Sequence, residues 1–124
     1  MAGGPLSGVK VIELAHIMAG PVFGMMLADM GADVIKVDKP TGDDTCRMVP
    51  PEIGGEAAAY MMMNRNKRGI ALNLKEPEAL EALRKLLSDA DVVVENYRTR
   101  SNIRRRRSRF LVRHPVWGNI PEKC

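Results

Sequence analysis

Cysteine is scarce in this sequence of 124 residues, and the two that occur, Cys46 and Cys124, are far apart. They provide neither a disulfide framework nor the ligand spacing of a metal site, so we assign no metal ligands and expect a reduced compartment. Long apolar runs are also absent, since none approaches the roughly 18 residues that a membrane span requires. Residues 1–5 lack the basic and apolar regions of a signal peptide. We therefore expect a soluble, cytoplasmic protein without a membrane partner.

Acidic residues are nearly missing from the C-terminal end of the sequence. Residues 98–124 contain nine Lys/Arg and one Asp/Glu, whereas residues 1–97 contain ten Lys/Arg and fourteen Asp/Glu. We predict that residues 1–97 form the folded domain and that residues 98–124 form a disordered basic tail. Clustered arginines repel one another, and the tail has little apolar surface to bury. The formal net charge of +4 therefore describes no single surface.

The four consecutive arginines at residues 104–107 allow two interpretations. They would suit a small basic adaptor that binds nucleic acid. However, the tail has neither the interleaved aromatic side chains that stack on bases nor a recognisable DNA-binding helix motif. The abrupt change of charge favours a shifted reading frame rich in arginine codons. We therefore do not expect a nucleic-acid partner.

Apolar segments and helical patterns alternate through the first part of the sequence. The sequence predicts strands at residues 9–14, 33–37, 70–74 and 91–95, and helices at residues 21–30, 57–64 and 76–89. Pro21 fits the first turn of a helix, and Gly31 stands where a left-handed helix stop is common. Strands that alternate with helices predict an α/β fold with a partial, Rossmann-like parallel sheet and flanking helices.

The segment from Leu14 to Pro21 leads from the carboxyl end of a strand into a helix. Ligands of open α/β sheets bind at such ends, where unpaired N–H groups and the helix dipole favour an anion. His16 in this segment is either a donor to a phosphate or thioester oxygen or a structural histidine. Gly20 allows close approach of a ligand and, with Gly24, tight packing of the helix on the sheet; the alternative is that both glycines serve only helix packing. The GxGxxG fingerprint of dinucleotide-binding folds is absent.

Residues 64–68 form a compact polar and basic cluster between apolar segments. Such a cluster can hold phosphates, because arginine forks onto oxygen atoms and lysine acts as a point charge. A solvated loop is the alternative interpretation.

Five motifs in this order resemble the N-terminal part of the family III CoA-transferases. They are residues 8–14 (GVKVIEL), 19–21 (AGP), 31–37 (GADVIKV), 64–68 (NRNKR) and 94–97 (VENY). That family includes formyl-CoA transferase, carnitine CoA-transferase and α-methylacyl-CoA racemase. The resemblance covers nearly all of residues 5–99 and is specific because the motifs occur together at family-like spacing.

The resemblance implies a transferase that moves CoA between carboxylic acids through acyl-aspartyl and CoA-thioester intermediates. It implies a CoA thioester and a carboxylic acid as substrates, no permanently bound cofactor, and the interlocked homodimers of the family. Met18 departs from members that have glutamine there. The CoA contacts that the resemblance implies are His16, Met18, Ala19, Lys39, Leu72, Asn73, Leu74, Lys75, Asn96, Tyr97 and Arg98.

The family's continuation, with its catalytic aspartate, is not recognisable from residue 100 onward. We therefore assign no catalytic residue and expect an inactive N-terminal fragment of such an enzyme. Within the family, the alternative is a fragment of an acyl-CoA racemase or epimerase, which would abstract an α-proton instead of transferring CoA.

Overall fold

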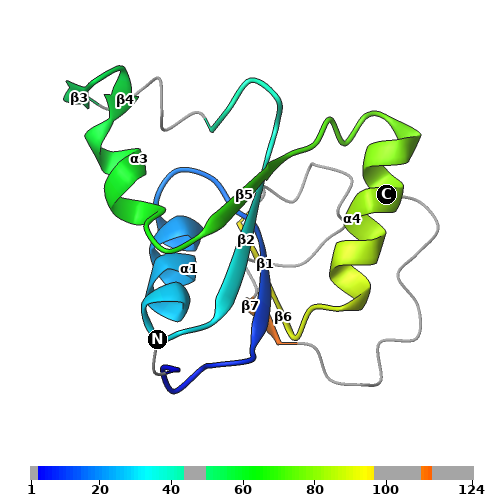
Figure 1. Cartoon of the computed structure of the whole chain (residues 1–124). Coiled ribbons are helices and arrows are strands. Elements are labelled where there is room, and N and C mark those ends of the chain that lie inside the picture. Colours follow the sequence, from blue (N-terminus) through cyan, green and yellow to red (C-terminus); the bar gives the residue numbers. More distant parts are fainter. Residues whose placement is uncertain (1–2, 44–49, 97–109, 113–124) are drawn as a thin grey trace.

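A five-stranded sheet forms the centre of the protein (Figure 1). The computed structural model describes residues 3–43, 50–96 and 110–112. The strands of the main sheet lie in the order β5-β2-β1-β6-β7, and a separate two-stranded hairpin pairs β3 with β4. The elements are β1 (Lys10–Leu14), α1 (Ala19–Asp29), β2 (Asp33–Asp38), β3 (Glu52–Ile53), β4 (Glu56–Ala57), α3 (Ala58–Met63), β5 (Arg68–Ala71), α4 (Pro77–Ser88), β6 (Val92–Glu95) and β7 (Phe110–Val112).

Four strands of the sheet are parallel, as the sequence predicts. β1 pairs in parallel with β2 on one side and with β6 on the other, and β2 pairs in parallel with β5. The chain builds the sheet outward from β1 to β2 and β5, and then crosses through α4 to place β6 on the opposite side of β1. In open α/β sheets, ligands bind at the carboxyl ends of the strands where the order reverses in this way.

The position of β5 differs from the prediction. The expected strand at residues 70–74 begins two residues earlier, at Arg68, and ends at Ala71. A turn ends it, because the backbone N–H of Lys75 bonds the side chain of Asn73 and the N–H of Glu76 bonds the Asn73 carbonyl. Residues 72–74 therefore lie in the loop beyond the strand, at the carboxyl edge of the sheet.

Three residues of the basic tail belong to the sheet. β7 pairs antiparallel with β6, at the edge that β6 would otherwise leave open. This strand is not among those predicted from the sequence, although Phe, Leu and Val are residues that strands favour. Residues 98–109 and 113–124 lie outside the described residues. For them, the prediction of a disordered tail stays a prediction.

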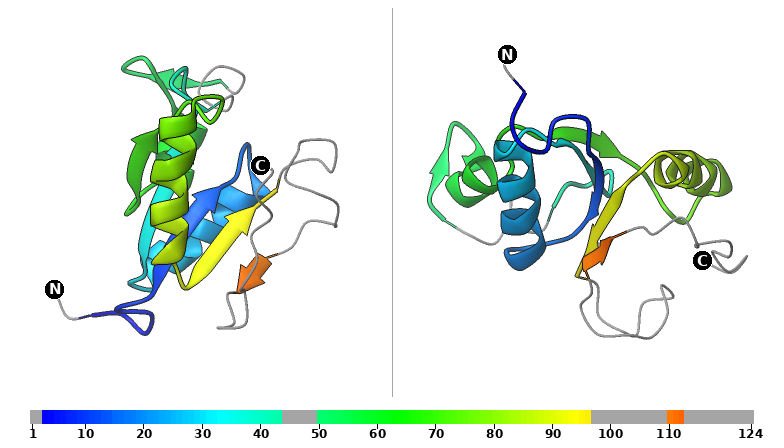
Figure 2. Two further views of the ribbon diagram at one scale, coloured as in Figure 1. Left: turned by 90° about the vertical axis from the view of Figure 1, so that its right-hand side faces the viewer. Right: turned by 90° about the horizontal axis from the view of Figure 1, so that it is seen from below.

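One helix covers each face of the parallel strands, and Figure 2 shows α1 and α4 on opposite sides of the sheet. Side chains of β1 alternate between the two faces. Val11 and Ala15 pack on the side of α1, whereas Ile12 and Leu14 pack on the side of α4. The other buried members of these two clusters are Ala28, Ala32, Val34 and Val94 on the α1 side, and Val37, Leu83 and Ala90 on the α4 side. Among the described residues, no helix is long and apolar enough to cross a membrane.

Candidate functional site

A hollow of about 200 Å³ lies at the carboxyl edge of the sheet, beyond the ends of β1, β2 and β5. Six of the predicted contact residues line it, and they come from three separate segments of the chain. The lining residues are His16, Val37, Asp38, Lys39, Leu72, Asn73, Leu74 and Lys75. The hollow combines two exposed lysines with apolar side chains. Such a surface suits an anionic ligand that also has an apolar part.

The turn between β1 and α1 stands beside this hollow and holds three of the predicted contact residues. α1 begins at Ala19, and Met18 before it makes no capping bond with its side chain. The first turn of the helix contains no acidic residue, so the positive end of the helix dipole is not neutralised there from within the helix. Ile17 has a φ angle of 69°, in the left-handed region that β-branched residues rarely adopt. This turn is a strained backbone segment that leads into a helix whose N-cap residue, Met18, makes no capping bond with its side chain.

Asn96 joins the end of β6 to this turn. Its side-chain Nδ2 donates to the His16 carbonyl at 2.7 Å, and its Oδ1 accepts from the His16 backbone N–H at 2.8 Å. The carboxamide of Asn96 therefore holds the backbone of His16 in place. The direct contact of Asn96 with CoA stays a prediction. The predicted contacts Tyr97 and Arg98 lie outside the described residues.

Two glycines of α1 allow the helix to pack closely on β1. A Cβ atom on Gly20 would overlap the side chain of Ala15, and a Cβ atom on Gly24 would overlap the carboxylate of Glu13. Both glycines are buried. Helix packing is therefore sufficient to explain both glycines. This supports helix packing over close approach of a ligand.

The basic cluster at residues 64–68 bonds to carboxylates of the protein itself. Arg65 makes a bidentate interaction with Asp29, in which its Nε and Nη2 each donate to one carboxylate oxygen. Arg68 does the same to Asp33 at 2.9 and 2.6 Å. These arginines tie the start of β5 and the residues before it to the C-terminal end of α1 and the start of β2, while their side chains stay half exposed. The phosphate-binding and solvated-loop interpretations both stay predictions. The hydrogen bond from Arg65 also lowers the pKa of Asp29, against the opposing effect of desolvation.

The third cation of that segment, Lys67, enters a buried group of charges. Its Nζ lies 2.8 Å from Oε2 of Glu13 and donates to the carbonyl of Pro21 at 2.8 Å. Glu13 is fully buried, and its other oxygen lies 3.4 Å from Nζ of Lys36. Burial lowers the pKa of Lys67, and the attraction of Glu13 offsets this only in part. One buried carboxylate thus bridges two lysines beneath the first half of α1.

Lys36 carries the other half of this group. Its Nζ lies 2.9 Å from Asp43 and 3.3 Å from Asp38, and it donates to the carbonyl of Ala15 at 2.9 Å. Burial acts to lower the pKa of Lys36, but Asp43, Asp38 and Glu13 outweigh burial and raise it. Neither Lys36 nor Asp43 is among the site residues predicted from the sequence. The available signal was the presence of Glu13 and Lys36 within two predicted strands of the sheet, since buried charges require partners.

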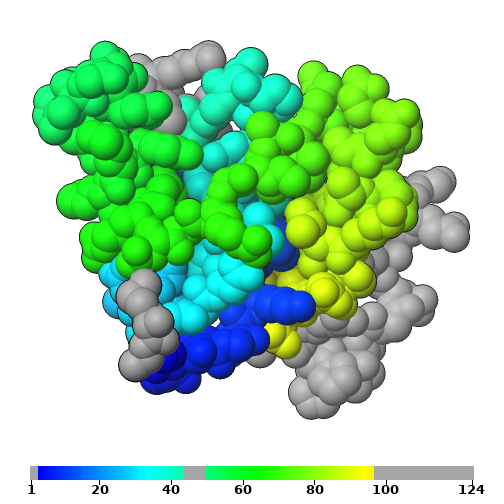
Figure 3. Space-filling model, viewed as in Figure 1, coloured from blue at the N-terminus to red at the C-terminus, as the bar shows by residue number. Residues whose placement is uncertain are grey.

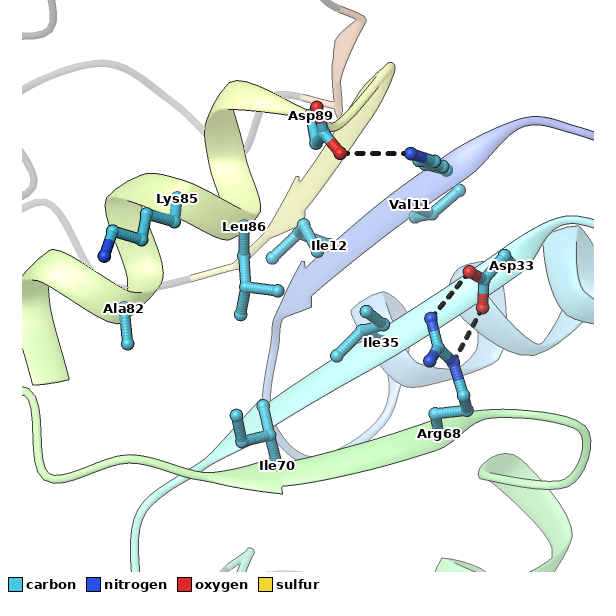
Figure 4. A pocket seen from close by; sticks show the side chains of 11 residues that line it. Val11, Ile12, Asp33, Ile35, Arg68, Ile70, Ala82, Lys85, Leu86 and Asp89 are labelled. Atoms are coloured by element: carbon cyan, nitrogen blue, oxygen red, sulfur yellow. Dashed lines mark hydrogen bonds and ion pairs between the residues drawn. The ribbon is translucent and has the colours of Figure 1, made fainter.

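A larger hollow of about 480 Å³ lies at the opposite end of the strands, between β5 and α4. Figure 3 shows this face of the molecule, with β5 to the left of α4. Figure 4 shows that Ile12, Ile35 and Leu86 point into the hollow. Two ion pairs stand at its rim, Lys10 with Asp89 and Arg68 with Asp33. None of the predicted contact residues lines this hollow.

Among the described residues, no group of three or more His, Cys, Asp or Glu side chains could hold a metal ion. Because the predicted contact residues among the described residues all lie there, we define the candidate site as the hollow at the carboxyl edge, the turn between β1 and α1, and Asn96.

Comparison with known proteins places this geometry in a family. Residues 6–107 match CoA-transferase family III, and the match extends past residue 97 into the basic tail. Human succinyl-CoA:glutarate CoA-transferase is 47% identical over 94 residues, which are 75% of this chain and 22% of that protein. Succinate–glutarate CoA-transferase of Agrobacterium fabrum is 54% identical over 101 residues, covering 76% of this chain and 25% of that protein. The chain thus spans about a quarter of the length of these relatives.

Solved structures agree with the sequence comparison. A CAIB/BAIF family protein from Brucella suis superimposes with a TM-score of 0.71 at 46% identity, covering 77% of this chain and 26% of that chain. A hypothetical protein from Mycobacterium tuberculosis gives a TM-score of 0.69 at 34% identity, with 77% and 26% coverage. Because the family match covers most of the sequence and these relatives share its fold, the chain belongs to CoA-transferase family III.

Proposed function

We propose that this chain binds CoA at the carboxyl edge of its sheet, as the N-terminal part of an enzyme that transfers CoA between carboxylic acids. The observation that carries this proposal is the convergence of His16, Lys39 and residues 72–75 on one hollow. The family resemblance implies CoA contacts at the same residues. The relatives reported above are named as CoA-transferases, which favours transfer over the abstraction of an α-proton by a racemase.

The lining of the hollow suits the chemistry of CoA. The phosphates of CoA are anionic, and Lys39 and Lys75 place two exposed cations at the hollow. The start of α1 at Ala19, where the Met18 side chain makes no capping bond, adds backbone N–H groups and a favourable dipole on the neighbouring turn. Leu72 and Leu74 supply apolar surface for the adenine or the pantetheine arm. We expect the lysines to contribute affinity and the leucines to contribute the distinction between CoA and simpler anions.

The transfer chemistry requires a group that the described site does not supply. In the mechanism that the resemblance implies, a carboxylate nucleophile attacks the acyl-CoA, forms an acyl-aspartyl anhydride and releases the CoA thiolate, which then attacks the aspartyl carbonyl to form the CoA thioester and release the first carboxylate. We find no counterpart of the family's catalytic aspartate in this sequence. We therefore propose that the 124-residue chain alone binds CoA without turnover. Acyl transfer between two carboxylic acids above a blank, abolished by a substitution in residues 1–97, would refute this part of the proposal.

The binding proposal is tested by titrating the ¹⁵N-labelled chain with CoA while recording amide NMR spectra. We expect the largest shift changes at Ala19, Lys39 and Lys75, and a dissociation constant of roughly 0.1–1 mM, which is about 4–6 kcal/mol. Lys39→Ala and Lys75→Ala should each weaken binding, mainly at low salt, because exposed charges are screened. Lys85→Ala is the matched control, since Lys85 is an exposed lysine that lies on α4 and lines the other hollow.

The arginines of the basic tail attract phosphates without forming a site, so the titration needs two further controls. One is an equally charged nucleotide that lacks the pantetheine arm. The other is a chain in which residues 104–107 are changed to glutamine. A specific site predicts that CoA binds more tightly than the nucleotide and that the glutamine variant keeps this preference. Equal affinity for both ligands, unchanged by Lys39→Ala and Lys75→Ala, would mean that only diffuse electrostatic attraction is present.

A further inference from the structure

One buried ammonium group connects the two loops that border the candidate site. Lys36 lies in the middle of β2 with 2% of its surface exposed. Its Nζ donates to the carbonyl of Ala15, at the start of the turn between β1 and α1. The same atom pairs with Asp43, which ends the described loop after β2. A single side chain thus contacts both segments from within the core.

The loop after β2 is held at both of its ends by this group. Asp38 at its start and Asp43 at its end both lie within ion-pair distance of Lys36. Between them, the N–H of Gly42 donates to the carbonyl of Lys39 at 2.9 Å, and Gly42 has a φ angle of 84° that favours glycine. The loop is therefore a closed turn with two anchors, and its exposed cation, Lys39, stands at the hollow.

Stability alone gives a weak reason for a lysine at this position. A buried ion pair is often no more stabilising than apolar side chains of the same volume, since desolvation of the charges opposes their attraction. A lysine provides what an apolar side chain cannot, namely directed bonds to the oxygens of Ala15 and Asp43 on two different loops. This arrangement fixes the position of one loop relative to the other.

We propose that Lys36 and Asp43 are positioning residues, which hold Lys39 and the turn at His16 in the relative arrangement that CoA binding needs. The inference rests on the proposed CoA site. It assigns no contact with CoA to either residue. Lys36 remains charged at neutral pH because its acidic partners raise its pKa in spite of burial.

The test is a pair of substitutions at Asp43 in the full chain. Asp43→Ala removes the anchor, whereas Asp43→Asn keeps an oxygen that accepts a bond from Lys36. We expect Asp43→Ala to weaken CoA binding about tenfold and Asp43→Asn to weaken it no more than about twofold. In the absence of CoA, the heteronuclear NOE of the Lys39 amide should fall in Asp43→Ala and stay unchanged in Asp43→Asn. Lys36→Met is not the first choice, since it removes the cation that pairs with Glu13, Asp38 and Asp43 in the core and endangers folding.

A double-mutant cycle with Lys39→Ala separates positioning from general loss of structure. If Asp43 acts by placing Lys39, then Asp43→Ala should cause little further loss of affinity in a chain that already contains Lys39→Ala. The same loss with and without Lys39, or no loss at all, would overturn the inference. If the unsubstituted chain shows no preference for CoA over the nucleotide, the proposed function fails and the inference fails with it. A preference that is sensitive to Lys39→Ala but not to Asp43→Ala would refute the positioning role alone.

Discussion

Gly24→Ala should strongly destabilise this protein, although alanine is the better helix former. Gly24 lies in the second turn of α1 and faces β1. A Cβ atom there would overlap the carboxylate of Glu13 and stand 3.3 Å from Nζ of Lys67. These are the partners of a buried ion pair at 2.8 Å. The added methyl group must therefore displace either the helix or the pair.

The expected magnitude follows from two opposing effects. Alanine in place of glycine in a helix interior is worth about 1 kcal/mol in its favour. Breaking a buried ion pair so that a charge is left without its partner costs about 3–5 kcal/mol. The expected net loss in the free energy of unfolding is therefore about 2–4 kcal/mol. At an m-value of about 1.5 kcal/mol per molar urea, the midpoint should fall by roughly 1.3–2.7 M.

Urea unfolding followed by far-ultraviolet circular dichroism measures this change. Gly69→Ala in β5 is the matched control, because a Cβ atom on Gly69 would meet nothing within 4 Å. That variant should be unchanged or about 0.4–1 kcal/mol more stable, since alanine reduces the freedom of the unfolded chain. A Gly24→Ala chain as stable as the unsubstituted protein would show that the helix does not depend on close contact with the buried pair.

Three further predictions concern the turn beside the site and the outer end of α1. Asn96→Ala should lower the free energy of unfolding by about 1–3 kcal/mol and speed hydrogen exchange of the His16 amide, because both backbone groups of His16 lose their partner; unchanged exchange would contradict this. Ile17→Asn should raise the free energy of unfolding by about 1 kcal/mol, because Ile17 is 54% exposed and asparagine tolerates its positive φ angle better; a loss of stability in urea would show that the isoleucine side chain packs usefully. The lowered pKa of Asp29 means that its pair with Arg65 contributes stability above about pH 4, which is lost as the pH falls through the folded-state pKa. Asp29→Asn should thus flatten the acid limb of the stability curve, and an identical slope below pH 4 in both proteins would refute this.

The elements that the sequence predicts well are those specified by local signals. β-branched runs, with Pro21 in the first turn of a helix and Gly31 after it, were sufficient for β1, α1 and β2. The place of the candidate site also follows from sequence, because the carboxyl ends of parallel strands share one edge. The end of β5 was less predictable, since Leu72 and Leu74 extend the alternating pattern beyond the turn at Asn73 that ends the strand.

The charge partners could not be predicted, because they depend on which segments the fold brings together. Residues 64–68 appear in sequence as a cluster of cations, but Asp29 and Asp33 lie more than thirty positions earlier. Lys36 pairs with Asp43 nearby and with Glu13 on the neighbouring strand. Sequence shows that each buried charge needs a partner, but the pairing of Lys36 with Glu13 follows only from the register of β1 against β2, which places the two residues opposite each other.

The pairing of β1 with β6 has a consequence for how the protein folds. β1 and β2 are joined by one helix and can associate early, but the bonds between His16 and Asn96 close a loop of 80 residues. Long loops make such contacts slow to form. During synthesis, the turn at His16 would leave the ribosome well before the residue that holds it. We therefore expect the candidate site to be among the last parts of the molecule to become ordered, which a pulsed hydrogen-exchange experiment on refolding chains would reveal as late protection of the His16 amide.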